Sequence, residues 1–201
     1  MASTRVGGMG VAAGALETES KHRIRDGAAV LAVLDRLGFR ADPVSLQADE
    51  YYDTPVGLLG AANLVLRLRV VDGQVTAGFK GPRSFLPDGS HARIEVELPA
   101  ADAEDVRAAL AEQGLVCVWR LQKRRREYHR PGLSIVVCLD ELPRLGHFVE
   151  LEGESDDIAE VRRSLGATIG PAEPLSYRDL ALRWLGEQGR TTTALTFGTA
   201  G

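Results

Sequence analysis

The chain has few cysteines, few aromatic residues and no long apolar run. Its 201 residues include 2 cysteines, Cys117 and Cys138, which do not form a Cys-x-x-Cys motif. We interpret them as buried free thiols in a reducing, cytoplasmic compartment, and a disulfide is the alternative. The apolar run within residues 133–139 is far too short to cross a membrane. The net charge of −4 gives no overall basic field, so neither nucleic acid nor a membrane is an expected partner.

The remaining composition is that of an ordinary globular protein. The chain is 44% apolar and 26% charged, and its length suits one domain, which we expect at residues 16–186. Residues 1–15 are interrupted by glycines and lack the apolar core of a signal peptide, so they are expected to be a disordered leader. Residues 187–201, rich in Thr, Gly and Ala, are expected to be a flexible tail.

Many strands joined by short turns, with a few helices between them, predict an α+β fold with a large antiparallel sheet. Asp72-Gly73 predicts a tight hairpin. Helices are expected from an Asp26 cap to Gly38, from an Asp102 cap to about Gly114, and after caps at Ser155 and Ser176. Alternation and turn signals predict strands at residues 16–25, 45–53, 63–71, 74–80, 91–98, 115–130, 133–139 and 147–153.

Three of these strands each carry two glutamates one residue apart, and other strands carry cations at the same spacing. Residues i and i+2 of a strand point to one face, so each pair projects its charges together. A solvated outer face would explain one such strand, but the repetition favours a closed barrel whose charges line a tunnel. The paired residues are Glu17 and Glu19, Glu95 and Glu97, Glu150 and Glu152, Lys21 and Arg23, Arg67 and Arg69, and Lys123 and Arg125.

Other polar and aromatic residues favour simpler interpretations. Arg124 and Arg126 have the wrong parity for the tunnel if Lys123 and Arg125 face it, so they predict a solvated basic patch. The four histidines, His22, His91, His129 and His147, are scattered without metal-ligand spacing. Tyr177 and Trp184 lie at helical spacing, which is more typical of a core than of a substrate stack.

The Glu17-x-Glu19-x-Lys21 signature resembles that of the CYTH proteins, also called triphosphate tunnel metalloenzymes. This family includes class IV adenylate cyclases, thiamine triphosphatases and inorganic tripolyphosphatases. Further matching blocks, in the family's order and over about residues 16–185, are Tyr51–Thr54, Leu66–Arg69, Phe79–Pro82, Arg93–Glu97, Lys123–Tyr128, Leu139–Glu141, Leu145–Glu152 and Ser176–Leu180. Thiamine triphosphatases of the animal type carry tryptophan where this chain has Val65, which argues against a dedicated role on thiamine triphosphate.

The resemblance implies an eight-stranded antiparallel barrel with flanking helices, a tunnel for a triphosphate, and Mg²⁺ or Mn²⁺ as cofactor. It implies metal ligands at Glu17, Glu19, Glu95, Glu97, Asp140, Glu150 and Glu152. It implies substrate-binding residues at Lys21, Arg67, Arg69, Lys80, Arg93, Lys123 and Arg125. Glu17, Glu19, Lys21 and Glu152 are the catalytic residues that it implies. It is also compatible with a homodimer.

The expected activity is metal-dependent hydrolysis of a nucleoside, thiamine or inorganic triphosphate. One alternative is a class IV adenylate cyclase that converts ATP to cyclic AMP and pyrophosphate in the same tunnel, with the ribose hydroxyl as nucleophile. Another is a non-catalytic protein that binds a nucleotide or polyphosphate, although anion capture alone would not need so many carboxylates.

Overall fold

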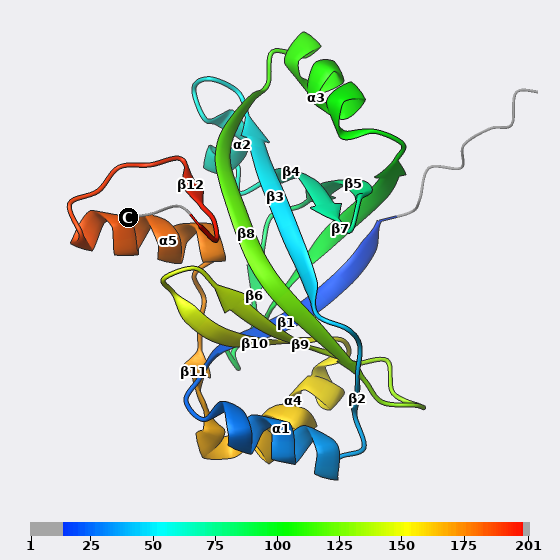
Figure 1. Cartoon of the computed structure of the whole chain (residues 1–201). Helices are drawn as coiled ribbons and strands as arrows, with labels where there is room; N and C mark the ends of the chain where they lie inside the picture. Colours follow the sequence, from blue (N-terminus) through cyan, green and yellow to red (C-terminus); the bar gives the residue numbers. More distant parts are fainter. Residues whose placement is uncertain (1–13, 199–201) are drawn as a thin grey trace, which may run out of the picture.

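A computed structural model describes residues 14–198 and shows a closed antiparallel barrel of eight strands (Figure 1). In ring order the strands are β1 (Ala15–Ile24), β10 (Gly146–Glu152), β9 (Val136–Leu142), β8 (Val116–His129), β3 (Ser45–Asp53), β4 (Val65–Val71), β5 (Gln74–Lys80) and β7 (His91–Ala100). Each strand pairs with its neighbours, and pairing of β1 with β7 closes the ring. The α+β barrel expected from the sequence is therefore confirmed.

Four short strands extend the sheet beyond the ring. They are β2 (Arg40–Ala41), β6 (Ser84–Phe85), β11 (Ile169–Ala172) and β12 (Ala194–Leu195). The last of them lies within the expected tail, where it pairs in parallel with β8 and buries Leu195. The tail is therefore packed against the barrel at this point, a contact that its composition does not predict.

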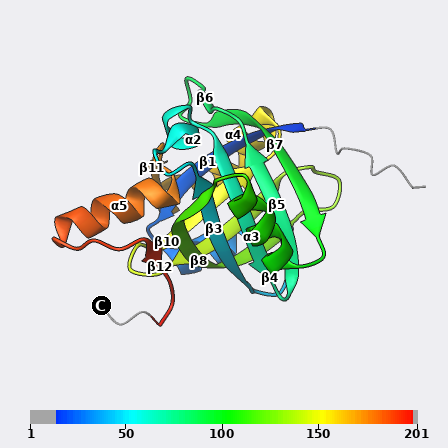
Figure 2. The same ribbon diagram turned by 90° about the horizontal axis from the view of Figure 1, so that it is seen from above.

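Helices cover much of the outside of the barrel (Figures 1 and 2). Asp26 and Asp102 cap their helices through backbone N–H groups, and Ser176 forms a capping box with Asp179, as the sequence predicts. Ser155 is wrong as a cap, because the N-cap position belongs to Glu154. The helices are α1 (Gly27–Arg36), α2 (Leu58–Ala61), α3 (Ala103–Glu112), α4 (Ser155–Leu165) and α5 (Tyr177–Glu187), with a 3₁₀ turn at Gly166–Thr168.

Two of the three apolar clusters lie between helices and the outer face of the barrel. Val149 and Leu151 of β10 pack in one cluster with residues of α1 and α4, such as Val30. A second outer cluster joins β4 and β5 to α3. Because the apolar side chains of these two clusters point outwards to the helices, the alternate side chains of the same strands point into the barrel. The third cluster joins α5 to Trp119 and Leu121, which have the parity of Lys123 and Arg125 and therefore lie on the inner face of β8.

Two strands start two or more residues away from the sequence expectation. The strand expected at 133–139 begins three residues later, at Val136, and continues to Leu142. Ile135, just before it, is buried in the core without belonging to a strand, so apolar character alone misplaces the start. The strand expected from Asn63 begins at Val65, because Asn63 has a left-handed φ of 55° that no strand residue adopts.

The Asp72-Gly73 hairpin between β4 and β5 is confirmed. Both residues have positive φ, 49° and 81°, as the type I′ turn requires.

Among the residues that the structure describes, no helix is long and apolar enough to span a membrane.

Candidate active site

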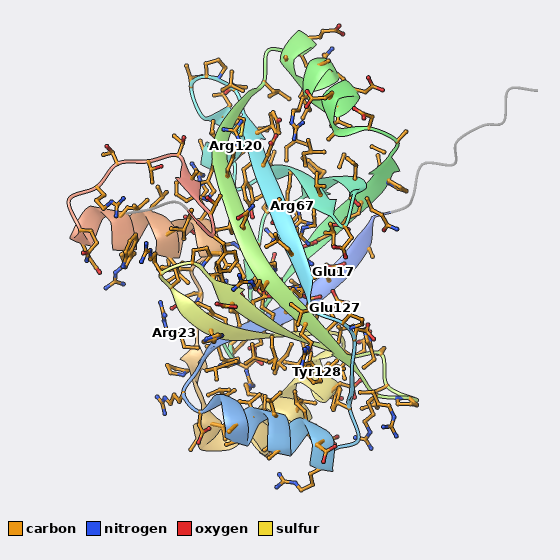
Figure 3. The ribbon with its side chains drawn as sticks, in the orientation of Figure 1. Glu17, Arg23, Arg67, Arg120, Glu127 and Tyr128 are labelled. Atoms are coloured by element: carbon orange, nitrogen blue, oxygen red, sulfur yellow. The ribbon has the colours of Figure 1, made fainter. Side chains whose placement is uncertain are left out.

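The interior of the barrel holds a charged cavity of about 350 Å³. Figure 3 marks Glu17, Arg67 and Glu127, three of the residues that line it. Every site residue expected from the sequence lines this cavity except Asp140. Those brought together are Glu17, Glu19, Lys21, Arg67, Arg69, Lys80, Arg93, Glu95, Glu97, Lys123, Arg125, Glu150 and Glu152.

Strand register explains why these charges meet. On one side of β1, Glu19 lies opposite Glu152, and Lys21 lies opposite Glu150. On its other side, Glu17 lies opposite Arg93 of β7. Side chains at directly opposed positions of antiparallel strands are close neighbours, so β1 brings the carboxylates of three strands together. We call the cavity-lining glutamates of β1, β7 and β10 the acidic wall: Glu17, Glu19, Glu95, Glu97, Glu150 and Glu152.

Carboxyl groups of the acidic wall repel one another. Partial burial, followed by the charge of nearby Glu95, raises the pKa of Glu17 to about 7. Burial and the charge of Glu150 likewise raise the pKa of Glu19. A divalent cation between these oxygens would relieve the repulsion, and carboxylate oxygens are the ligands that Mg²⁺ and Mn²⁺ prefer. The ligand type of the acidic wall therefore suits such a cation, and among the described residues no three of its carboxylates have oxygens within 4.8 Å of one another.

Some carboxylates of this wall are already paired with cations. Glu95 contacts Lys80 and accepts a hydrogen bond from Nε of Arg93 at 2.9 Å. Burial would raise the pKa of Glu95, but the charge of Lys80 lowers this pKa to about 2. Glu97 pairs with Arg67. Glu95 and Glu97 thus form ion pairs with residues that are candidates for phosphate binding.

Asp140 lies behind the cavity surface and holds two of its cations. Its side chain accepts hydrogen bonds from Arg125 Nε and Nη2, both at 2.7 Å, and from Lys123 Nζ at 3.0 Å. The Tyr177 hydroxyl donates a further bond at 2.9 Å. Burial alone would raise the pKa of Asp140, but Arg125 and Lys123 hold it well below its usual range. Asp140 is placed to position these cations, and its oxygens are directed at them.

Asp49 positions the cations of β4 as Asp140 positions those of β8, and the sequence interpretation missed this residue. Its two oxygens accept bonds from Arg69 Nε at 2.7 Å and Nη2 at 2.8 Å. Despite burial, this contact with Arg69 and the charge of Arg67 hold the pKa of Asp49 well below its usual range. Asp49 has the same parity as Tyr51 and Asp53 on its strand, a signal that could have placed it inside the barrel. The cations that Asp49 and Asp140 hold, on β4 and β8, form what we call the basic wall: Arg67, Arg69, Lys123 and Arg125.

Lys21 differs from the other cations of the cavity. It is 4% exposed, and its ammonium lies 4.6 Å from the ring centroid of Tyr177. Among the described residues, no carboxylate forms an ion pair with it within 4.0 Å, whereas Lys80, Lys123 and Arg125 all have such partners. Lys21 is therefore a desolvated cation with unused hydrogen-bonding capacity.

His91 and Tyr177 line the cavity as well, which the sequence interpretation did not anticipate. His91 Nε2 lies 3.2 Å from Glu19 Oε1, and burial together with the charge of Arg93 lowers the histidine pKa to about 4. Tyr177 is a core residue, as expected, and packs on Phe148, but its ring also lies under Lys21 and Lys123. Arg124 and Arg126 are exposed, which confirms their outward parity.

His129, which shows no metal-ligand spacing in the sequence, lies near two carboxylates in the structure. Its ligand atom and those of Asp42 and Glu127 lie within 4.8 Å of one another, the one such group of three among residues 14–198. Of these three, only Glu127 lines the cavity. The contact depends on pairing of β2 with β8, which the sequence does not reveal.

Comparisons with known proteins agree with the fold. The family model of the CYTH domain matches residues 15–169. A Methanocaldococcus jannaschii protein, provisionally named an adenylate cyclase, is 30% identical over 145 residues, 72% of this chain and 81% of its own length. The PH1819 protein of Pyrococcus horikoshii has a solved structure that matches with a TM-score of 0.67 and 27% identity, covering 84% of this chain and 99% of that one.

A more distant structural match shares the fold. It is a Hippeastrum protein, HpAC1, named provisionally as an adenylyl cyclase and described as having a dominant triphosphatase activity. Its TM-score is 0.60 at 17% identity, with 88% of this chain and 97% of that chain covered. The family model and the Methanocaldococcus relative carry the assignment of family, and on that evidence this chain belongs to the CYTH domain family.

Proposed function

We propose that this protein is a divalent-metal-dependent enzyme that hydrolyses a triphosphate bound in the barrel. The observation that carries the proposal is the division of one cavity into an acidic wall and a basic wall. Carboxylates alone would suit a metal site and cations alone would suit anion capture. Their combination suits a metal–triphosphate complex, which presents both kinds of charge.

Glu17 and Glu19 would hold the cation, because among the described residues neither forms an ion pair with lysine or arginine and both have raised pKa values. Glu152, opposite Glu19, would complete the set on release of its contact with Arg125 Nη1 at 3.1 Å. When bound, a divalent cation neutralises charge on the phosphoryl group under attack and lowers the pKa of a coordinated water. Glu150 lies close to Arg125 and Lys123, so it links the metal ligands to the phosphate-binding side chains.

The basic wall would grip the phosphate oxygens. Arg69 and Arg125 are each locked by a bidentate contact to an aspartate, which fixes their orientation before substrate arrives. Lys21 has no carboxylate partner among the described residues and can turn its ammonium to a phosphate oxygen. Fixed cations of this kind stabilise charge as it develops on the leaving group.

Hydrolysis needs only a water as nucleophile, whereas cyclisation of ATP also needs a pocket for the nucleoside. The triphosphatase activity described for HpAC1 supports the first choice at the level of a shared fold. The second candidate, a class IV adenylate cyclase, is favoured by the name of the Methanocaldococcus relative. It is also favoured by a neutral part of the cavity lining, to which Asn63, Leu64 and Val65 contribute.

Product analysis by mass spectrometry tests the proposal. Purified protein is incubated with tripolyphosphate, ATP or thiamine triphosphate, each with Mg²⁺, Mn²⁺ or a chelator. We expect orthophosphate and the matching diphosphate, only with metal. Cyclic AMP and pyrophosphate from ATP would instead establish the cyclase.

Two glutamine variants control the experiment. Glu19→Gln removes a carboxylate from the acidic wall, and Glu141→Gln removes one from the outer face of β9, where it pairs with Arg124. We expect loss of turnover only for Glu19→Gln. If no metal-dependent product forms and Glu19→Gln binds tripolyphosphate as tightly as the wild type, the protein is a binder and the proposal is wrong.

A further inference from the structure

Outside the acidic and basic walls, a second group of possible metal ligands lies where β2 meets the end of β8 (Figure 1). It consists of Asp42, Glu127 and His129, which we call the β2–β8 cluster. Within residues 14–198 it is the one group of three whose ligand atoms all lie within 4.8 Å of one another. The part of the chain that the structure describes therefore has one set of three ligands already gathered, and that set is not the acidic wall.

Strand pairing assembles the β2–β8 cluster. Arg40 of β2 lies opposite His129 of β8. Two residues further on, the backbone N–H of Asp42 donates to the carbonyl of Glu127 at 2.9 Å, so the pairing continues to this point. Glu127 and His129 are two residues apart on β8, and their side chains share one face of the strand. The paired backbones thus bring all three ligand groups to one place.

The two carboxylates of the cluster have no lysine or arginine partner among the described residues. Asp42 and Glu127 lie beside each other across the pairing, where like charges are unfavourable. Their ion-pair partner is His129, whose Nε2 lies 3.2 Å from Asp42 Oδ2 and 3.7 Å from Glu127 Oε2. With a neutral imidazole the cluster carries two negative charges, which one divalent cation would balance.

The separations within the cluster suit a transition-metal ion. Zn²⁺ binds histidine nitrogen and carboxylate oxygen at about 2.0–2.2 Å. With bonds of about 2.1 Å, the two separations from His129 Nε2 correspond to angles of about 100° and about 120° at the metal, which a four-coordinate ion adopts. The three side chains are partly exposed, so water can supply the remaining ligand.

The imidazole distinguishes this cluster from the acidic wall in the ion that it would select. Mg²⁺ prefers a set of oxygen ligands, as the acidic wall offers. An imidazole nitrogen favours Zn²⁺, Ni²⁺ or Co²⁺, and Mn²⁺ is the weakest of these first-row ions at such a site. The two groups of ligands should therefore differ in metal preference.

We propose that the β2–β8 cluster binds one Zn²⁺ or a similar transition-metal ion and so ties β2 to the end of β8. Because Glu127 also lines the cavity, the ion would neutralise a negative charge of the cavity lining. None of the three ligands belongs to the acidic or the basic wall, so this inference does not depend on the proposed enzymatic function.

Titration with Zn²⁺ against a chromophoric chelator, in a large excess of Mg²⁺, tests the site. All proteins carry Glu19→Gln to reduce any contribution of the acidic wall. We expect one Zn²⁺ per chain with micromolar affinity, weakened at least about 100-fold by His129→Gln. The matched control is His147→Gln, because His147 is exposed on β10 and lies opposite one carboxylate, Glu141. The control should bind Zn²⁺ with unchanged affinity.

Nuclear magnetic resonance of the histidine ring nitrogens identifies the ligand directly. Zn²⁺ should shift the ring resonances of His129, assigned by their loss in His129→Gln, and leave those of His147 in place. Thermal unfolding gives a second measurement, because Zn²⁺ should raise the melting temperature and Asp42→Asn should reduce that rise.

Three results would overturn the proposal. They are no uptake of Zn²⁺, equal uptake by the His129→Gln and His147→Gln variants, and ring resonances of His129 that do not move when Zn²⁺ is bound. In each case His129 would be only an ion-pair partner of the two carboxylates. Each result would leave the enzymatic proposal intact, since that proposal is tested by turnover of a triphosphate.

Discussion

Two pairs of carboxyl groups in the barrel have pKa values that shift in opposite directions: Glu17 and Glu19 of β1, and Asp49 of β3 with Asp140 of β9. The first two are raised by burial and by neighbouring glutamates. The other two are lowered because bidentate arginines outweigh the effect of burial. Asp49 and Asp140 thus have their partners within the protein, whereas Glu17 and Glu19 form no ion pair with lysine or arginine among the described residues and remain available to a cation.

This contrast separates two kinds of site residue. A carboxylate with its partner already in place organises the basic wall and contributes to folding. A carboxylate crowded by other carboxylates destabilises the metal-free protein through repulsion, and a bound cation would relieve that repulsion. Variants of the two kinds should therefore affect stability and activity in different proportions.

The largest effect is expected from Asp140→Asn. Removing this charge leaves the guanidinium of Arg125 and the ammonium of Lys123 buried without their main partner. Breaking a buried ion pair in this way costs about 3–5 kcal/mol, so the free energy of unfolding in urea should fall by that amount. Glu141→Gln, at the next and partly exposed position, should change it by less than about 1 kcal/mol. Equal effects of the two variants would contradict the positioning role of Asp140.

Glu19→Gln should reduce activity strongly and leave stability unchanged or raised, the reverse of Asp140→Asn. Turnover of tripolyphosphate with Mg²⁺ should fall at least about 100-fold, which corresponds to about 2.7 kcal/mol of transition-state stabilisation. The melting temperature of the metal-free protein should stay constant or rise, because the substitution relieves repulsion from Glu150. Steady-state kinetics and thermal unfolding of the same preparation check both statements. A variant that loses stability in proportion to activity would make Glu19 a structural residue.

Lys21→Met tests the role of Lys21, the cavity cation that has no carboxylate partner among the described residues. The ammonium of Lys21 should donate to a phosphate oxygen, and a hydrogen bond to a charged group contributes about 1.5–3 kcal/mol. Affinity for tripolyphosphate, measured by calorimetry in the Glu19→Gln background to prevent turnover, should fall about 10- to 100-fold. Arg124→Gln removes an outward cation of β8 and should leave the affinity unchanged. Similar losses in both variants would indicate a general effect of net charge.

The smallest effect is expected from pH. The folded-state pKa of Glu17, about 7, lies above its ordinary value of 4.5, so the folded state holds a proton that the unfolded state releases. The resulting stability is present below about pH 4.5 and is lost as the pH rises through about 7. In a chelator, Glu17→Gln should therefore remove part of the decrease in melting temperature between about pH 5 and pH 8. A pH profile that Glu17→Gln does not change would contradict the repulsion among Glu17, Glu95 and Glu152.

Most of the barrel could be predicted from local signals. The capping residues Asp26, Asp102 and Ser176 and the Asp72-Gly73 turn act within a few residues, so the sequence displays them directly. The start of β9 was misplaced because an apolar residue such as Ile135 can be buried with or without a strand. The packing of Leu195 on β8 joins segments distant in the chain, and no local pattern reports it.

Side-chain parity predicted which charges share the cavity but not which pair with one another. Alternation placed Lys123 and Arg125 inside and Arg124 and Arg126 outside, and the structure agrees. The hydrogen bonds of Asp140 to Lys123 and Arg125 depend on the register between β8 and β9, which the sequence leaves open. For the same reason the part played by Asp49 and the place of His91 beside Glu19 could not be predicted.

Titration with Mn²⁺, followed by electron paramagnetic resonance of the free ion, tests most directly whether the acidic wall is the cation site. Wild type, Glu19→Gln and Glu141→Gln are compared without tripolyphosphate, which the wild type is proposed to hydrolyse and which itself binds Mn²⁺. The account predicts that the wild type and Glu141→Gln take up Mn²⁺ with the same affinity, and that Glu19→Gln binds it at least about 10-fold more weakly. Equal uptake by all three proteins, or no uptake by the wild type, would contradict it.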